Sequence, residues 1–599
     1  MAEEKTLSGV SRSFKYFSTE KLRIFGAAIF LFFLPLIIHN EYYIHLFQTM
    51  AYTYIIILGL DVLVGYTGNF SFGHAGFYAI GAYTTALLTT KLGWSFWIAL
   101  PFAPLLAGLA GIGMAIPSMR PKGPFVIMVT AAFGLIIYIV SNQWVSLTGG
   151  PSGILHIPVP AIFGHEFNGT QYFYLCSGLA LFLHIGAQNI LRARWGRTFF
   201  SLQISEIAAE SLGVNVYWWK IKAFVISAAY AGVSGSLFAH QNHFINSDSF
   251  NLYQSIFFLL AVIFGGMGTR YGPLVGTIIL SVLPQIFAPI YDYYFLVYGA
   301  ILLCFVVVLP RGVVGTIQYW EFFRRRRKIA KFEISKRSSP DAEKIPISNP
   351  TSLQINNLTL SFGGLRAIND LFIKIEPGII HGLIGPNGSG KTTLINLISG
   401  IYEPDEGEII YEGENIASIS PHQIAAKGIA RTFQTTQLFE HISVLENVMV
   451  GFHTQMKANF LHHYLWTTKA RDDEEKHIRD SMDMLNFIGI QDKAYEEAGN
   501  LSHGHKKFLE VGRALALRPR LILLDEPAGG LSSGEIQDLL MIIKELRLDG
   551  ITVLLVEHRM ELVMEICDRI TVLNFGMKIA EGTPEEIQNN EEVVKAYLG

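Results

Sequence analysis

The sequence has few charged side chains for its length. Of 599 residues, 16% are charged and 50% are hydrophobic. This composition is too apolar for an ordinary soluble protein, and the chain is too long for one domain. The shortage is uneven, because residues 24–310 hold nearly all the long apolar runs, while 350–599 have the charge density of a cytosolic protein. We therefore expect a membrane part followed by a soluble part.

Cysteine is also scarce. The three cysteines, Cys176, Cys304 and Cys567, lie far apart and form no C-x-x-C pair. This spacing argues against a disulfide framework and against a zinc site, and favours isolated thiols. The net charge of −3 gives no reason to expect a nucleic-acid partner.

Basic residues are missing from one long gap in the apolar half. Residues 144–171 contain no Lys or Arg, whereas the gap 119–123 carries Arg120 and Lys122, and the gap 191–220 carries several more. Because Lys and Arg collect in cytoplasmic loops, we expect this gap outside the membrane and the basic gaps inside. Lys91 is the exception. A start inside and an even number of spans also place the soluble part in the cytoplasm.

The apolar runs predict an α-helical polytopic membrane domain. A straight span needs roughly 20 residues. The first run has no small-residue cleavage site and continues into further apolar segments, so we interpret it as a span and not as a removed signal peptide. Some runs are short or interrupted by glycine, so we expect about eight to ten spans among the candidates 24–39, 43–65, 73–89, 94–118, 124–143, 172–190, 221–240, 253–266, 273–290 and 294–309.

These patterns divide the chain into four parts: a cytoplasmic tail 1–23, a transmembrane domain 24–316, a linker 317–350 and a soluble domain 351–599. The linker begins with a basic block that suits an anionic inner leaflet, with a nucleic-acid patch as the weak alternative. Its Ser- and Pro-rich remainder is typical of a tether.

Polar groups inside a membrane are costly and often functional. Residues 64–76, VGYTGNFSFGHAG, carry many such groups, and His74 is a candidate for the substrate path. A hydrogen bond from His74 to a neighbouring helix is the alternative. Glycine is dense in the spans, which predicts close helix packing, with broken helices lining a cavity as the second possibility.

Residues 204–213, ISEIAAESLG, predict a short amphipathic helix in a basic inside loop. The segment lacks the apolar length to cross a membrane. We expect it to act as a coupling helix that docks on the soluble domain, with Glu206 and Glu210 as its candidate residues. A helix lying on the membrane surface is the alternative.

The stretch GPNGSGKTT predicts a phosphate-binding loop, because it follows a short apolar strand and precedes a helical pattern. Glycines aim successive backbone N–H groups inward, and these donors and the helix N-terminus hold phosphates. Lys391 reaches the β- and γ-phosphates, and the Thr392 hydroxyl ligates Mg²⁺. The predicted ATP-binding residues here are Gly385, Asn387, Gly388, Ser389, Gly390, Lys391, Thr392 and Thr393.

The apolar half resembles the permease subunit of branched-chain (hydrophobic) amino acid ABC importers. The resemblance runs over most of residues 40–310 and is carried by VGYTGNFSFGHAGFYAIGAYTTALL, SLTGGPSGI, EIAAESLGVNVYWWKIKAFVISAAYAGVSGSLFAH and VIFGGMGTRYGPLVGTIIL.

The soluble half resembles the ATP-binding subunit of the same importers, an α/β P-loop ABC ATPase. The narrower match lies in FGGLRAIND, GIARTFQTTQLFEHISVLENVMVG and EGTPEEIQNNEEVVKAYLG. The resemblance implies that Phe362 stacks on adenine, that Gln434 and Asp525 serve Mg²⁺, that Glu526 polarises the attacking water, and that His558 contacts the γ-phosphate.

The family signature, usually LSGGQ, stands here as LSHGH, residues 501–505. The resemblance implies that Ser502 and Gly504 reach in trans to the γ-phosphate held by a partner. His503 and His505 replace the usual Gly and Gln, and AGGLSS after Pro527 lacks the usual Asp of the next loop. Both departures affect what this subunit offers to the nucleotide held by its partner, while its own phosphate-binding residues look intact.

The resemblance implies ATP-driven import of branched-chain or hydrophobic amino acids across the bacterial inner membrane by a fused permease and ATPase, with ATP and Mg²⁺ as cofactors. A second permease, a second ATPase and a periplasmic solute-binding protein are the expected partners. Urea, amide or aromatic acid cargo, a homodimeric exporter, and an ATP-gated channel or regulator are the alternatives.

Overall fold

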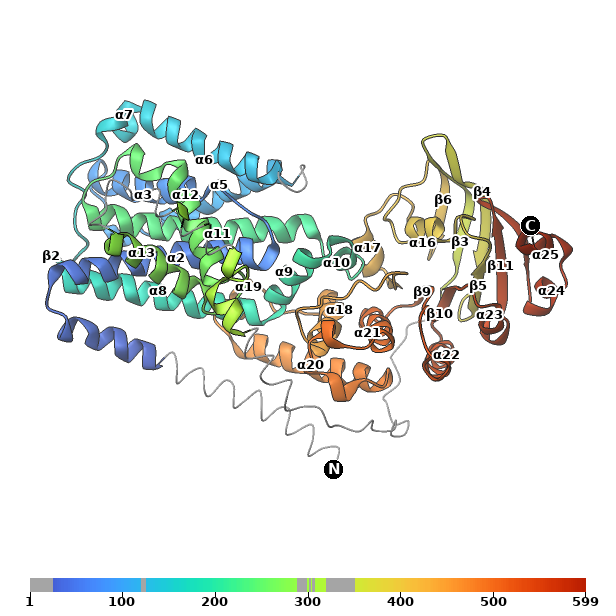
Figure 1. Cartoon of the computed structure of the whole chain (residues 1–599). Helices are drawn as coiled ribbons and strands as arrows, with labels where there is room; N and C mark the ends of the chain where they lie inside the picture. The colour runs from blue at the N-terminus through green and yellow to red at the C-terminus, as the bar shows by residue number, and fades with distance from the viewer. Residues whose placement is uncertain are drawn as a thin grey trace. The chain divides into compact units, whose positions relative to one another are not determined.

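The computed structural model describes residues 25–119, 125–287, 299–300, 303, 307–318 and 351–598. The described residues form two compact units, which are treated separately below (Figure 1). One unit draws on Met1–Asn189 and Lys220–Phe332, and the other on Ile190–Trp219 and Glu333–Gly599. The short segment Ile190–Trp219, which joins two apolar helices in sequence, thus groups with the C-terminal part of the chain. The tail 1–23 and most of the linker lie outside the described residues.

The first unit is helical. Within the described residues, six helical stretches are long and apolar enough to cross a membrane: Glu41–Thr67, Phe96–Ser118, Phe125–Gln143, Gly169–Arg192, Val216–Asn242 and Ser247–Gly265. Two shorter apolar helices are Phe25–Ile37 and Gly272–Ile286. These helices make the chain a membrane protein. Most of the tenth candidate span, 294–309, lies outside the described residues.

The helices of this unit, in order, are α2 (Glu41–Thr67), α3 (His74–Thr90), α4 (Phe96–Ala99), α5 (Phe102–Ser118), α6 (Phe125–Gln143), α7 (Val145–Thr148), α8 (Gly169–Arg192), α11 (Val216–Asn242), α12 (Leu252–Gly265) and α13 (Gly272–Phe287). Residues 144–171, the gap without Lys or Arg, include an antiparallel hairpin of two short strands, β1 (Ala161–Ile162) and β2 (His165–Glu166).

Glycines let α3 and α11 approach closely. A Cβ on Gly81 would lie 2.1 Å from the carbonyl oxygen of Gly232, and a Cβ on Gly235 would lie 2.0 Å from that of Tyr78. Neither distance is sterically possible, so the backbones meet only because these side chains are absent. The packing account of the glycine-rich runs thus has direct support at this crossing.

The second unit is built on two sheets. A six-stranded sheet has the order β12-β11-β5-β10-β9-β8, in which β11, β5, β10, β9 and β8 are parallel and β12 is antiparallel to β11. Its strands are β5 (Ile380–Ile384), β8 (Ile429–Arg431), β9 (Leu521–Asp525), β10 (Thr552–Val556), β11 (Arg569–Asn574) and β12 (Met577–Gly582). An antiparallel sheet has the order β4-β3-β6-β7, with β3 (Leu353–Phe362), β4 (Leu365–Ile375), β6 (Glu406–Tyr411) and β7 (Glu414–Asn415).

The parallel strands are covered on both faces, which explains why they read as continuous apolar runs. All five residues of β9 and of β10 are buried. Along β10, Val553 and Leu555 enter one apolar cluster with helices, whereas Leu554 and Val556 enter another with the antiparallel sheet. The main core therefore lies on both sides of this sheet.

The helices of the second unit are α9 (Arg194–Ile204), α10 (Glu206–Glu210), α16 (Lys391–Ile398), α17 (Pro421–Ala426), α18 (Val444–Gly451), α19 (Phe460–Tyr464), α20 (Thr468–Phe487), α21 (His503–Leu515), α22 (Ser533–Leu548), α23 (Met560–Ile566), α24 (Pro584–Gln588) and α25 (Glu591–Leu598). Helices α18, α20 and α21 contact one another and form a helical group beside the sheets (Figure 1).

Replacing Gly81 with Leu is expected to destabilise the membrane unit, because the side chain would overlap the Gly232 backbone. Overpacking of this kind costs about 1–3 kcal/mol or more. Thermal unfolding of the detergent-solubilised chain measures the loss. Gly113→Leu is the matched control, since a Cβ there meets no atom within 4 Å. An equal, small change in both variants would contradict the close approach of α3 and α11.

Candidate functional site

The parallel sheet brings its functional residues to one edge. Strand β5 ends at Ile384, directly before the phosphate loop, and β9 ends at Asp525. Strand β10 ends at Val556, two residues before His558. Because β5, β10 and β9 are parallel neighbours, their carboxyl ends meet at the same edge, where open α/β sheets bind ligands.

The phosphate loop needs glycine at two positions. Gly385 has φ 153°, and a Cβ there would lie 2.2 Å from the Leu573 carbonyl oxygen. Gly390 has φ 103°, and its Cβ would lie 2.7 Å from the Ala367 carbonyl oxygen. Gly390 is also the N-cap of α16, so the loop delivers the chain into a helix N-terminus. This arrangement offers backbone N–H donors to an anion.

The other predicted loop residues sit around this turn. Asn387, Gly388 and Thr392 are exposed, Thr393 is half-buried, and Ser389 is buried. Within the described residues the Ser389 hydroxyl has no hydrogen-bond partner. Its position leaves it available to a bound group.

Lys391 folds back onto its own loop. Its ammonium donates to the carbonyl oxygens of Gly385 at 2.8 Å and Pro386 at 2.9 Å. Burial lowers the pKa of Lys391, and the nearby Glu526 and Asp525 carboxylates oppose this shift. The ammonium is thus held at the loop, with carbonyl partners that a phosphate oxygen can replace.

Glu526 is held by two other predicted residues. Its carboxylate accepts from His558 Nε2 at 2.7 Å and from Gln434 Nε2 at 3.2 Å. Glu526 itself has φ 48°, a left-handed conformation that is uncommon for residues other than glycine. The sheet edge therefore brings together Glu526, His558 and Gln434, the residues predicted to polarise water, to contact the γ-phosphate and to serve Mg²⁺.

Asp525 tests whether the site can hold Mg²⁺. The side chain is 1% exposed, and neither carboxylate oxygen has a hydrogen-bond partner within the described residues. Burial raises the pKa of Asp525 to about 6, against the opposing charge of Arg431. A buried carboxylate without donors suits a cation. The Thr392 hydroxyl and the Gln434 amide oxygen add the oxygen ligands that Mg²⁺ prefers, so the residues fit this ion.

Two charged residues of α21 hold the Gln434 loop, and the sequence reasoning missed both. Lys507 Nζ donates to the Gln434 carbonyl oxygen at 2.8 Å. Glu510 Oε1 accepts from the backbone N–H groups of Phe433 at 3.2 Å and Gln437 at 3.4 Å. Both side chains are buried. The available signal was the three-residue spacing of Lys507, Glu510 and Arg513, which places three charges on the buried face of α21.

Ser502 caps the N-terminus of α21. Its hydroxyl accepts from the His505 backbone N–H at 3.3 Å and is hydrogen-bonded to His505 Nδ1 at 2.8 Å. Burial and then the Lys493 ammonium lower the pKa of His505, so its ring is neutral near pH 7. A Cβ on Gly504 would lie 1.9 Å from Glu535 Oε1, so a larger residue there would have to displace the Glu535 carboxylate, which accepts hydrogen bonds from Ser532.

The first histidine of the altered signature has a partner of its own. His503 Nε2 is 3.1 Å from the Gly529 carbonyl oxygen, in the AGGLSS loop. Both departures from the usual signature are therefore used in local hydrogen bonds. Phe362 lies at the end of β3, is 47% exposed, and packs edge-on against Tyr402 at 5.3 Å.

The remaining candidates belong to other elements. In the membrane unit His74 is fully buried, and its ring nitrogens contact the hydroxyls of Ser71 at 3.0 Å and Ser227 at 2.6 Å. Ser227 belongs to α11, so His74 links two helices. In α10, Glu206 is exposed and Glu210 is half-buried.

Family models match three parts of the chain. Residues 42–306 match the branched-chain amino acid transport system permease component. Residues 368–529 match the ABC transporter model, and 577–599 match the branched-chain amino acid ATP-binding cassette transporter model.

Curated relatives cover the two halves separately. The second half is 42% identical over 248 residues to the high-affinity branched-chain amino acid transport ATP-binding protein BraF of Pseudomonas aeruginosa, covering 41% of this chain and 97% of that protein. It is 41% identical over 248 residues to LivG of Escherichia coli, again covering 41% and 97%. The first half is 36% identical over 291 residues to the permease protein LivM of Escherichia coli, covering 44% of this chain and 68% of LivM.

A solved nucleotide-free ATP-binding cassette from an ABC transporter is 35% identical, with a TM-score of 0.37, and covers 42% of this chain and 99% of its own. The permease and ATP-binding matches occur in one chain, whereas the curated relatives carry them in separate proteins. The chain therefore belongs to the branched-chain amino acid ABC transporters, as a permease fused to an ATP-binding component.

Proposed function

We propose that this chain imports branched-chain or other hydrophobic amino acids across the bacterial inner membrane, driven by ATP. ATP hydrolysis coupled to transport is the activity of its family. One observation carries the catalytic part of the proposal, namely the convergence of Glu526, His558 and Gln434 at the edge next to the phosphate loop. The identity of the cargo is inferred from the relatives, which are branched-chain amino acid transport proteins. The N-terminus and the ATPase domain, residues 351–599, are cytoplasmic, and residues 24–316 form the permease.

The phosphate loop and Lys391 bind the nucleotide phosphates, and Phe362 stacks on adenine. Glu526 orients and polarises the attacking water, because its carboxylate is the fixed acceptor at this edge. His558 contacts the γ-phosphate. Its hydrogen bond to Glu526 holds the imidazole at the sheet edge, next to the phosphate loop. Positioning and electrostatic stabilisation supply most of the catalysis in such phosphoryl transfers.

Thr392, Asp525 and Gln434 are the residues that would hold Mg²⁺. The bound ion neutralises phosphate charge. The orphaned Asp525 oxygens support this assignment.

The site is one half of a shared site. Ser502 and Gly504 serve a nucleotide held by a second ATPase, and a second signature serves the nucleotide held here. We favour a heteromer with a second permease and a second ATPase, because the curated relatives include separate permease and ATP-binding components. A periplasmic solute-binding protein delivers the cargo.

Lys391→Ala is expected to weaken ATP binding by about a hundredfold, because it removes charge-assisted hydrogen bonds worth roughly 1.5–3 kcal/mol each. Binding of a fluorescent ATP analogue to the purified chain measures this loss. Lys544→Ala is the control, since Lys544 pairs with Glu565 on the surface. Unchanged binding in Lys391→Ala would refute the site assignment.

Glu526→Gln is expected to slow ATP hydrolysis by about 10² to 10⁴-fold, the usual contribution of a positioned acid or base, while ATP still binds. Amino acid uptake into vesicles should stop with hydrolysis. Glu561→Gln on the exposed start of α23 should change neither. Full uptake after hydrolysis has stopped would rule out active transport driven by this site.

Ser502→Arg is expected to impair the nucleotide site of the partner ATPase and to spare the one on this chain. Photo-labelling with an azido-ATP, followed by separation of the subunits, reports the occupancy of each site. Gln537→Arg, on an exposed surface of α22 outside the AGGLSS loop, controls for the added charge. Loss of labelling on this chain instead would argue that the signature does not act in trans.

A further inference from the structure

The segment Ile190–Trp219 packs against the ATPase through contacts that are separate from the ATP site. It runs from the last residues of α8 to the first residues of α11, yet it belongs to the same compact unit as residues 333–599. Its helices α9 and α10 contact α18 and α17 of the ATPase. The polar part of this contact is made mainly by α9, upstream of most of the segment 204–213.

A buried ion pair forms the centre of the contact. Arg197 Nη2 donates to Glu474 Oε2 at 2.8 Å and to Oε1 at 3.0 Å, and the two side chains are 6% and 8% exposed. The Arg194 backbone N–H donates to the same carboxylate at 2.8 Å. Burial alone would raise the pKa of Glu474, but Arg197, His463 and this N–H outweigh it and lower the pKa to about 2. Glu474 is therefore charged at every physiological pH.

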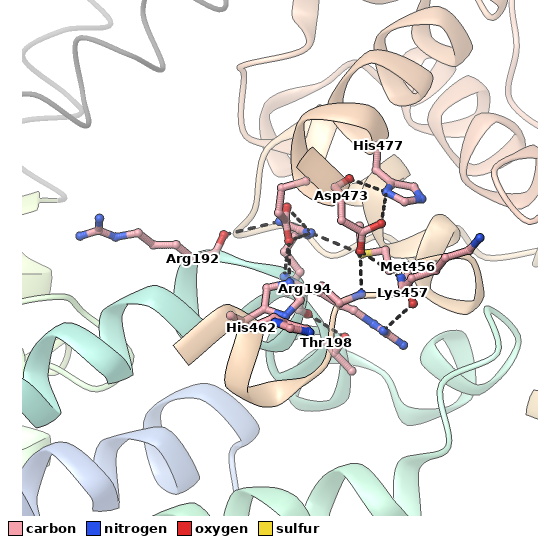
Figure 2. A network of polar contacts seen from close by, with 12 residues as sticks. Arg192, Arg194, Thr198, Met456, Lys457, His462, Asp473 and His477 are labelled. Carbon is pink, nitrogen blue, oxygen red and sulfur yellow. Dashed lines mark hydrogen bonds and ion pairs between the residues drawn. The ribbon is translucent and has the colours of Figure 1, made fainter. Parts of the chain in front are cut away.

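Arg194 extends the contact along the surface of the ATPase. Its guanidinium donates to the Met456 carbonyl oxygen at 3.0 Å and lies 3.3–3.4 Å from the ring nitrogens of His453. Thr198 Oγ1 is hydrogen-bonded to His453 Nδ1 at 3.1 Å. Figure 2 shows Arg194 reaching towards Met456, while the side chain of Arg192 points away from the cluster.

The partner surface is itself held in shape. Asp473 Oδ2 accepts from the backbone N–H groups of Lys457 and Ala458, both at 3.0 Å, and the Asp473 carbonyl oxygen bonds His477 Nδ1 at 2.7 Å (Figure 2). The chain around Met456 is thus fixed to α20, next to Glu474. The same surface therefore offers the Met456 carbonyl oxygen to Arg194 and the Glu474 carboxylate to Arg197.

Apolar contacts surround the charges. Ala208 and Leu212 are buried in the core cluster of the ATPase, and Phe200 and Ile204 pack against it. The ring of Trp195 lies 5.0 Å from that of Phe460. Burial of these apolar side chains favours association of the segment with the ATPase, but it does not fix their relative orientation, because the hydrophobic effect is not directional.

The ion pair between Arg197 and Glu474 adds a directional contact to the apolar ones. A buried ion pair is weak evidence for stability, because desolvation offsets its attraction, whereas removing one partner leaves an uncompensated charge. Its geometry fixes one register of α9 against α20. Helix α20 packs on α21, which begins at the signature and holds the Gln434 loop through Lys507 and Glu510. A displacement of α9 therefore has a continuous packed route to Gln434.

We propose that Arg197 and Glu474, aligned by Arg194, anchor the ATPase half to the membrane-loop segment of its own chain and transmit movement between transport and hydrolysis. They are positioning residues, because they touch neither nucleotide nor cargo. The proposal rests on the proposed function and moves the coupling contact from Glu206 and Glu210 to α9. Fusion then fixes which permease loop each ATPase domain engages.

The test uses the full chain with its partners, in variants Arg197→Met, Arg197→Lys and Glu474→Gln. Loss of the charge pair is expected to lower the amino acid transported per ATP by about tenfold, in the range by which residues between sites modulate coupling, while basal hydrolysis changes less than about twofold. Arg197→Lys keeps the charge and should recover most of the coupling. Glu206→Gln is the comparison, and uncoupling by it with full coupling in Arg197→Met would overturn the proposal.

A second readout does not depend on cargo. Asn215 Nδ2 lies 2.9 Å from His422 Nε2, and both residues are half-buried at the same contact. Cysteines at these positions, in a chain with its own cysteines replaced, should be joined by a short bis-maleimide. Docking within one chain gives a product of monomer mass, 66.8 kDa, that stays joined after cleavage at a protease site placed in the linker. A product of twice that mass would refute docking within the chain.

Arg197→Met should reduce the joined product by about tenfold, on the same coupling range, and Arg197→Lys should preserve it. Equal yields in all variants would refute the anchor. If the parent chain forms the joined product but moves no branched-chain amino acid, the proposed function fails and the anchor stands.

Discussion

The carboxyl ends of neighbouring parallel strands must meet at one edge of a sheet, and the catalytic half of this protein depends on that constraint. Strands β5, β10 and β9 deliver the phosphate loop, His558 and Glu526 from segments far apart in sequence. Burial of both sheet faces stabilises the strands that hold them. The left-handed conformation of Glu526 and the glycines of the loop are local costs that this scaffold offsets.

Several buried charged side chains of the ATPase unit lie at contacts where one segment is held in a fixed position against another. Asp525, at the predicted cation position, is buried and receives no hydrogen bond within the part of the chain that the structure describes. Glu510 and Lys507 hold the Gln434 loop, and Glu474 accepts from Arg197 and from the Arg194 backbone. Each burial costs desolvation energy that an apolar side chain would avoid. In return, hydrogen bonds and ion pairs fix the orientation of the groups they join, which apolar contacts do not. Fixed orientation suits the transmission of small displacements from a helix to a loop.

Much of the ATP site could be predicted from the sequence, because its residues lie in short motifs whose spacing is fixed by strand, turn and helix. Gly385 to Thr393 and the pair Asp525 and Glu526 are of this kind. Lys507 and Glu510 could not be assigned a role, since their partners are backbone groups 73 to 77 residues away. His74 could be singled out as unusual, but only packing placed its two nitrogens against Ser71 and Ser227.

Composition alone divides the chain into an apolar and a soluble half, the local strand, glycine loop and helix pattern predicts the phosphate loop, and the family resemblance implies the order of the other ATPase motifs. The hydrogen bonds of Glu526 with His558 and Gln434, and those of the signature histidines with Ser502 and Gly529, became visible only in the fold. The fold alone brought Arg197 to Glu474, 277 residues away. The reason is physical, since a charge pair across such a separation exists only where packing has already brought two helices together.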